Sequence, residues 1–179
     1  MKKSKIKSLL LLLLCGIVYL TFAVGSSSSN TTTTSSPGTT TQSKTSEISK
    51  YKLNEDIYIT NSKGKYRLKF TNVSETSDRN EFSDTVADRV IIIEYEYENI
   101  SQEGDLFISS SEFNLYDKDN NKMETYPATG TKYPTNVGTG RKTTASLAFA
   151  LNNSSNYIEL DYYDNMFNNK PDCRVILEW

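Results

Sequence analysis

The stretch DRVIIIEYEYEN at residues 88–99 determines the fold class expected for this chain. One side of it carries Ile91, Ile93, Tyr95 and Tyr97, and the other side carries Ile92, Glu94, Glu96 and Glu98. Successive side chains of a β-strand point to opposite faces of the sheet. The alternation therefore predicts a strand with one buried face and one solvated face.

The same period of two recurs on both sides of this stretch. Alternating apolar positions occupy GKYRLKFTNV (64–73), SEFNLYD (111–117), TTASLAFAL (143–151), NYIELDYYD (156–164) and CRVILEW (173–179), and KLNEDIYIT (52–60) predicts a shorter first strand. Turn residues separate these segments, and the polar stretch 75–88 is expected to hold no more than a short turn. The pattern predicts about seven or eight antiparallel strands in a two-sheet β-sandwich, with a small barrel as the alternative.

Residues 1–25 are expected to direct the chain out of the cytoplasm. Four lysines in MKKSKIK precede 17 residues, 8–24, that carry no charge. A positive segment before an apolar run is typical of an export signal, and small residues just before Ser26 permit cleavage there. The same segment permits an uncleaved membrane anchor, so signal peptide and anchor remain alternatives. Lipidation of Cys15 is less favoured, because a leucine rather than a small residue precedes it.

Residues 26–50 are predicted to be a disordered linker. Within 26–46, 8 of the 21 residues are serine and 8 are threonine, and such a segment buries too little apolar surface to offset the entropy of ordering. The remaining residues, 51–179, carry 14 Lys and Arg against 21 Asp and Glu, a net charge of −7, whereas the whole chain is at −2. An acidic domain is repelled by polyanions, so we expect no nucleic-acid partner.

The residue types that the chain lacks restrict its chemistry. It has no histidine, which excludes a Ser-His-Asp triad, a Cys-His pair and a histidine-ligated zinc site. Its two cysteines, Cys15 and Cys173, lie in different segments, and no disulfide is expected. Cys173 alternates with apolar residues, as a small core residue does. We expect no catalytic residue, no cofactor and no metal site.

The run DKDNNK at 117–122 has the oxygen spacing that begins a calcium loop. Such a loop needs glycine at its sixth position and a bidentate glutamate at its twelfth, and this chain has Lys122 and Ala128 there. Asp and Asn are equally typical of tight turns. A hairpin turn is therefore the favoured interpretation of this run.

The three glutamates of the opening stretch have two interpretations. Residues two apart on a strand are about 6.6 Å apart, which is near the spacing of glycosidase carboxylates. Alternate acids are more commonly the solvated face of a strand. We predict that the two charged rows lie side by side as cross-strand ion pairs, which would make the carboxylates poor general acids. The rows are Glu94, Glu96 and Glu98 against Lys65, Arg67 and Lys69.

The long connection METYPATGTKYPTNVGTG, residues 123–140, contains two Tyr-Pro pairs. Tyrosines on loops make rigid contact surfaces that are both apolar and polar. Tyr126 and Tyr133 are therefore the predicted ligand-contact residues. The alternative is that one or both fold back over the edge of the sandwich.

The order of these motifs resembles that of a known family. A hydrophobic strand ending in Glu98-Asn99 is followed by SSSEFNLYDKDNNK, a glycine-containing turn at Gly138 and Gly140, and TTASLAFAL. Over roughly residues 52–178 the chain is similar to bacterial extracellular immunoglobulin-like domains grouped with the mycobacterial immunoprotective extracellular antigen. The resemblance implies an immunoglobulin-like β-sandwich on a Gram-positive surface or secreted protein. It transfers no catalytic residue, and Ser26 stands where a lipidated cysteine could have been.

These observations together predict a non-catalytic, extracytoplasmic domain of residues 51–179 that binds a protein or glycan partner. The chain would be secreted, or held at the membrane by residues 1–25 if they are not cleaved. The alternatives are a carboxylate-based envelope glycosidase and an inhibitor or shield domain that blocks another protein.

Overall fold

A computed structural model describes residues 47–179 of the chain. The predicted signal or anchor segment 1–25, with Cys15, and most of the predicted linker 26–50 lie outside the described residues. Among residues 47–179, no helix has the length and hydropathy of a membrane-spanning segment.

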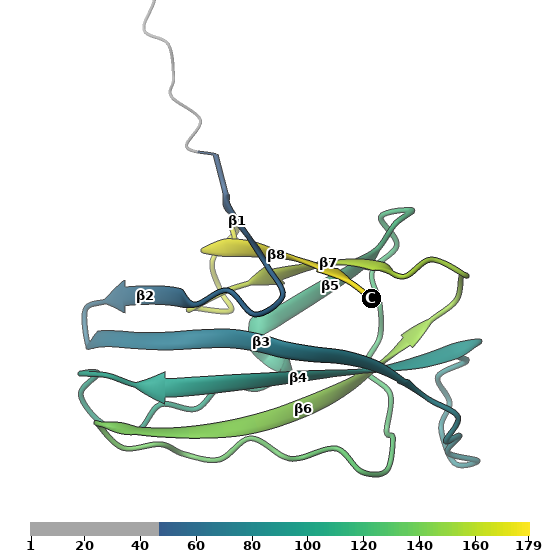
Figure 1. Cartoon of the computed structure of the whole chain (residues 1–179), viewed down its shortest axis with the longest axis horizontal. Coiled ribbons are helices and arrows are strands. Elements are labelled where there is room, and N and C mark those ends of the chain that lie inside the picture. The colour runs from purple at the N-terminus through teal and green to yellow at the C-terminus, as the bar shows by residue number, and fades with distance from the viewer. Residues whose placement is uncertain (1–46) are drawn as a thin grey trace, which may run out of the picture. The chain divides into compact units, whose positions relative to one another are not determined.

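Two four-stranded sheets pack face to face (Figure 1). The first sheet has the order β1 (Ser49–Lys52), β8 (Cys173–Glu178), β7 (Tyr157–Tyr162), β5 (Phe113–Asp117). The second has the order β2 (Ile57–Asn61), β3 (Gly64–Thr76), β4 (Arg89–Asn99), β6 (Arg141–Leu151). A single turn of 3₁₀ helix, η1 (Ser110–Glu112), precedes β5. The predicted all-β, two-sheet sandwich is confirmed, and the barrel alternative is wrong because the strands form two separate sheets.

The predicted alternation holds along the strands, with one exception at the start of the domain. The expected single strand 52–60 is two strands, because Asn54 adopts a left-handed backbone conformation (φ 67°) that turns the chain from β1 to β2. β1 joins the first sheet, where it pairs parallel with β8, and β2 pairs antiparallel with β3 in the second sheet. β1 begins at Ser49, two residues before the predicted start of the domain.

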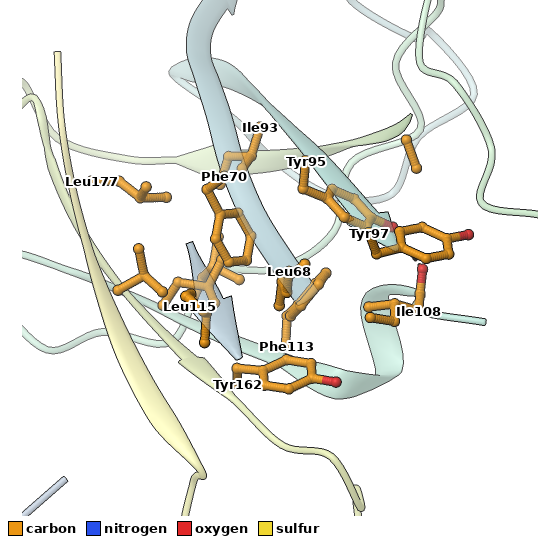
Figure 2. Close-up of a cluster of buried hydrophobic side chains, with 14 of the residues drawn as sticks. Leu68, Phe70, Ile93, Tyr95, Tyr97, Ile108, Phe113, Leu115, Tyr162 and Leu177 are labelled. Atoms are coloured by element: carbon orange, nitrogen blue, oxygen red, sulfur yellow. Dashed lines mark hydrogen bonds between the residues drawn. The ribbon is translucent and has the colours of Figure 1, made fainter. Parts of the chain in front are cut away.

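The core lies between the two sheets and is rich in aromatic rings (Figure 2). Phe113 on β5 contacts rings from the opposite sheet, with centroids 5.6 Å from Phe70 and 5.3 Å from Tyr95. Both contacts have the edge-to-face geometry that aromatic quadrupoles favour. Full burial of one such side chain stabilises the fold by about 1.5–3 kcal/mol.

The connection from β5 to β6 covers the outer edges of both strands. The Met123 amide donates to the Leu115 carbonyl on β5 at 2.8 Å, and the Tyr126 amide donates to the Ala148 carbonyl on β6 at 2.8 Å. Further along, the Ser146 amide donates to the Lys132 carbonyl. These two edges are therefore closed by the protein's own backbone.

The loops gather at the two ends of the sandwich (Figure 1). The end at which β1 begins, here called the N-terminal end, also holds residues 61–64, 100–109 and 163–172. The opposite end, here called the distal end, holds residues 77–88, 118–122 and 152–156.

Candidate binding surface

The structure places the two predicted contact tyrosines in different environments. Tyr133 is 81% exposed, whereas Tyr126 is 7% exposed and packs against Val90, Ala148 and Ala150. The alternative that a tyrosine folds back over the sandwich therefore holds for Tyr126. The two side chains do not form one surface.

Tyr126 instead supports the distal loop, residues 77–88. Its hydroxyl accepts a hydrogen bond from the Asn80 amide at 2.8 Å. The Asn80 side chain donates to the Pro127 carbonyl at 3.1 Å and accepts from the Phe82 amide at 2.9 Å. One asparagine thus joins the distal loop to the β5–β6 connection and also fixes the turn that carries Phe82.

A second group of hydrogen bonds closes the base of the distal loop. The Arg79 guanidinium donates to three backbone carbonyls, those of Thr76, Asp78 and Asp88, at 2.9, 2.9 and 3.0 Å. The Asn152 side chain accepts from the Asp88 amide at 2.9 Å and donates to the Val86 carbonyl at 3.3 Å. Side-chain hydrogen bonds therefore tie the loop backbone to the segments on both of its flanks.

The distal loop exposes its two large apolar side chains although its backbone is held. Phe82 is 88% exposed and Val86 is 80% exposed. Shallow depressions lie beside them, one of about 360 Å³ between Phe82 and residues 127–129 and one of about 380 Å³ between Val86 and residues 121–124. An ordered loop with outward apolar side chains is a surface suited to contact with another molecule.

The N-terminal end has a depression of about 400 Å³. It lies between the β2–β3 turn and residues 105–108 and 164–165, and the half-exposed ring of Phe107 lines it. The nearby Phe167 is 84% exposed. This end therefore also displays aromatic rings, and it provides matched controls for the distal loop.

A buried hydrogen-bond chain lies below that depression and joins the two sheets. The Tyr66 hydroxyl is 2.5 Å from Asp164 Oδ1 and 2.6 Å from the Tyr162 hydroxyl. Tyr66 donates to Asp164, and because a phenol hydroxyl has only one proton to donate, Tyr162 donates to Tyr66. Burial raises the pKa of both tyrosines, so both hydroxyls keep their protons at neutral pH. These hydrogen bonds between Tyr162, Tyr66 and Asp164 have the properties of a structural link between the two sheets.

The predicted rows of opposite charge lie side by side on β3 and β4. Arg67 is opposite Glu98 and Lys69 is opposite Glu96 in the strand register. The Arg67 guanidinium contacts Glu98 at 2.9 Å and also bonds to Glu96. The predicted cross-strand ion pair is therefore confirmed. Glu94 pairs with Asn72 instead, because a bulge between Phe70 and Asn72 shifts the register.

The ion pairs favour the ionised form of the carboxyl groups of Glu96 and Asp56 on this sheet face. Burial opposes ionisation of Glu96, but hydrogen bonds from Arg67 and Lys142 outweigh it and hold its pKa below the ordinary value. Hydrogen bonds from Lys69 and Arg67 likewise lower the pKa of Asp56. Carboxylates that lose their protons this readily are poor general acids, because a glycosidase acid needs a raised pKa.

Asp117 organises the hairpin turn that the run 117–122 was expected to form. Its Oδ1 accepts from the amides of Asp119 and Asn121, and its Oδ2 accepts from the side chains of Asn121 and Asn153. These donors fill the oxygens that a calcium ion would need. Within residues 47–179, no group of three or more acidic or cysteine side chains is arranged to hold a metal ion.

Cys173 begins β8 and is buried in the core with a free thiol. Burial, followed by the nearby Asp172 and Asp161, raises the pKa of the thiol to about 12. A thiol that stays protonated at neutral pH is a poor nucleophile, which agrees with the role of a small core residue predicted from the sequence.

Sequence reasoning missed the apolar side chains that the structure exposes at the two ends. Phe82 and Val86 lie in a polar stretch without alternation, and Phe107 and Phe167 lie in other connections. The one available signal was a large apolar residue isolated among acids and amides, as in NEFSDTV at residues 80–86. A lone aromatic in such a stretch can equally return to the core, so its exposure needed the structure.

Comparison with known proteins gives a likeness of fold. No family model matches the chain, and neither does any curated protein. A solved structure of MPT63, a secreted protein from Mycobacterium tuberculosis, is 14% identical with a TM-score of 0.58, over 75% of this chain and 99% of that protein. The yjhA protein from Bacillus subtilis is 19% identical with a TM-score of 0.48, over 72% of this chain and 98% of that protein. The likeness to MPT63 shows that the two share a fold.

Proposed function

We propose that the chain is a non-catalytic binding domain that acts outside the cytoplasmic membrane and contacts a partner through its distal loop. The observation that carries the proposal is that this loop is held by hydrogen bonds on both flanks while Phe82 and Val86 point into solvent. A loop ordered before binding loses little conformational entropy when it binds. Exposed aromatic side chains on a rigid scaffold are typical of recognition surfaces.

Three observations support an extracytoplasmic location. Residues 1–25 have the charge and apolar pattern of a signal peptide or anchor, and residues 26–50 have the composition of a disordered linker. The domain of residues 51–179 shares its fold with a secreted mycobacterial protein. In this proposal the domain belongs to the immunoglobulin-like family that the sequence motifs resemble, on a Gram-positive bacterium.

The non-catalytic part of the proposal is supported by the state of the side chains that an enzyme would use. Glu96 and Glu98 are engaged by Arg67 on an open sheet face, and Cys173 is buried and protonated. A glycosidase needs two carboxylates that converge across a cleft, one of them with a raised pKa. The glutamates instead occupy one strand and point in one direction.

The location is tested by adding a protease to intact cells that express the full chain. The domain should be digested while an intracellular control protein stays whole. A chain lacking residues 1–25 should be protected, because it has lost the export segment. Protection of the full chain in cells whose outer envelope is permeable to the protease would contradict the location.

Binding is tested on the same cells by mild solubilisation and native electrophoresis. The full chain should migrate in a complex larger than the free chain. Replacing Phe82 and Val86 together by serine should release the free chain, whereas Phe167→Ser at the N-terminal end should not. Migration as the free chain in every case would contradict a binding role.

A further inference from the structure

The charge of the distal loop says more about its partner than its apolar side chains do. Its acidic residues are all exposed and number four, namely Asp78, Glu81, Asp84 and Asp88. Its only cation, Arg79, directs its guanidinium to the loop's own backbone carbonyls. A partner would therefore meet two apolar side chains within a field of negative charge.

Most of this negative charge has no partner within the domain. Asp78 accepts from the Thr129 hydroxyl. In contrast, the side chains of Glu81, Asp84 and Asp88 make no hydrogen bond or ion pair with any residue from 47 to 179. Glu81 precedes Phe82, and Asp84 and Asp88 are each two residues from Val86 in the sequence. All three carboxylates remain free to pair with an incoming surface. Lys122, which lines the depression beside Val86, is an exception to this acidic character.

Resting on the proposed function, we propose that the distal loop binds a protein whose surface has an apolar pocket ringed by lysine and arginine. Phe82 and Val86 enter the pocket, and Glu81, Asp84 and Asp88 pair with the basic rim. Buried aromatic anchors supply most of the affinity of such interfaces, while rim charges speed association and select the partner. Acidic side chains around the anchors disfavour the anionic surface of a membrane and the phosphates of nucleic acid.

The partner surface is identified by site-specific photo-cross-linking in the cells that make the chain. The photoreactive residue p-benzoylphenylalanine replaces Phe82 in the full chain, and in a control it replaces Phe167, which is equally exposed at the opposite end. After irradiation, mass spectrometry identifies the peptide attached at each position. The expected result is a protein adduct at position 82, with apolar residues at the attachment point and Lys or Arg beside it, and no such adduct at position 167.

Other adducts at position 82 overturn the inference. These are a lipid, a second copy of this chain, or a protein segment that is neutral or acidic. A complex on native gels without any adduct at position 82, or with adducts at position 167 alone, overturns the assignment of the distal loop but leaves a binding function. Absence of any complex contradicts the proposed function itself.

The contribution of charge to binding is measured between the full chain and the partner protein, purified after cross-linking has identified it. Phe82→Ala should weaken binding at least about 30-fold, as truncation of a buried anchor does, while Phe167→Ala leaves it unchanged. Replacing Glu81 by Gln and Asp84 by Asn should slow association and reduce its dependence on salt. If the association rate depended equally on salt with and without these carboxylates, the inference of a basic rim on the partner would be wrong.

Discussion

The most direct test of the distal loop is the substitution Tyr126→Phe. It removes one hydroxyl and leaves the ring in its small cluster with Val90, Ala148 and Ala150. The amide of Asn80 then loses the acceptor that lies 2.8 Å away. The change therefore isolates one hydrogen bond between the loop and the β5–β6 connection.

The size of the effect follows from that single bond. A neutral intramolecular hydrogen bond contributes about 0.5–1.5 kcal/mol, and a loss of about 1 kcal/mol makes local opening about 5-fold more frequent. The global free energy of unfolding should fall by no more than about the same amount, out of a typical 5–15 kcal/mol. The fold should thus persist while the loop opens more often.

Hydrogen exchange of the full chain, followed by mass spectrometry, measures this opening. Peptides covering residues 77–88 should exchange about 5-fold faster in Tyr126→Phe, whereas peptides from β4 keep their protection. The matched control is Tyr133→Phe, since that exposed hydroxyl makes no hydrogen bond within the described part of the chain. Unchanged exchange of the loop in Tyr126→Phe, or an equal change in Tyr133→Phe, would refute the reasoning.

Three further predictions concern the sandwich. The fold lowers the pKa of Asp56 and Glu96, so their ionised carboxylates contribute their full stabilisation above the ordinary carboxyl pKa of about 4. The free energy of unfolding should therefore fall as the pH drops below about 4 and these carboxylates gain protons. Arg67→Gln should reduce this dependence of the urea midpoint on pH, whereas Lys63→Gln should leave it as steep as in the unmodified chain. The same pH dependence in the unmodified chain and both variants would contradict a stabilising role for the charge rows. Cys173 should resist a thiol reagent at pH 8 and react once urea unfolds the domain, in a chain whose other cysteine is serine; rapid native labelling would show an open site. Leu177→Ala should lower the free energy of unfolding by about 2–5 kcal/mol, as core truncations do, while the exposed neighbour Glu178→Ala changes the melting temperature little; similar melting temperatures for both would contradict the burial of β8.

The strands could be predicted because each buries one face, and burial of one face leaves a period of two in the sequence. The charge rows followed from the same logic, since neighbouring antiparallel strands bring solvated faces together. The turn at Asn54 was not predicted, because the sequence does not show that this asparagine adopts a positive φ. In the sequence it resembles any other polar residue at the end of a strand. The order β1 then β2 in different sheets depends on that one backbone conformation.

The site was less predictable because it depends on contacts between distant segments. Tyr126 and Tyr133 have the same local sequence, Tyr-Pro, yet one is buried and one is exposed. Tyr126 is held by Asn80, 46 residues away, and no local pattern encodes that pairing. The apolar residues of the distal loop lacked any periodicity, so their outward direction became evident only with the fold.

The parallel pairing of β1 with β8 has a mechanical consequence. The chain enters the domain through β1. Four residue pairs join β1 to β8, from Ser49 with Cys173 to Lys52 with Ile176. A pull on the N-terminus against a partner held at the distal end would run along the strands, so it would load the hydrogen bonds of β1 in shear and all together. Opening the domain would then require these bonds to break at once rather than one after another. Under such a pull, β1 would act as a clamp that resists unfolding of the domain.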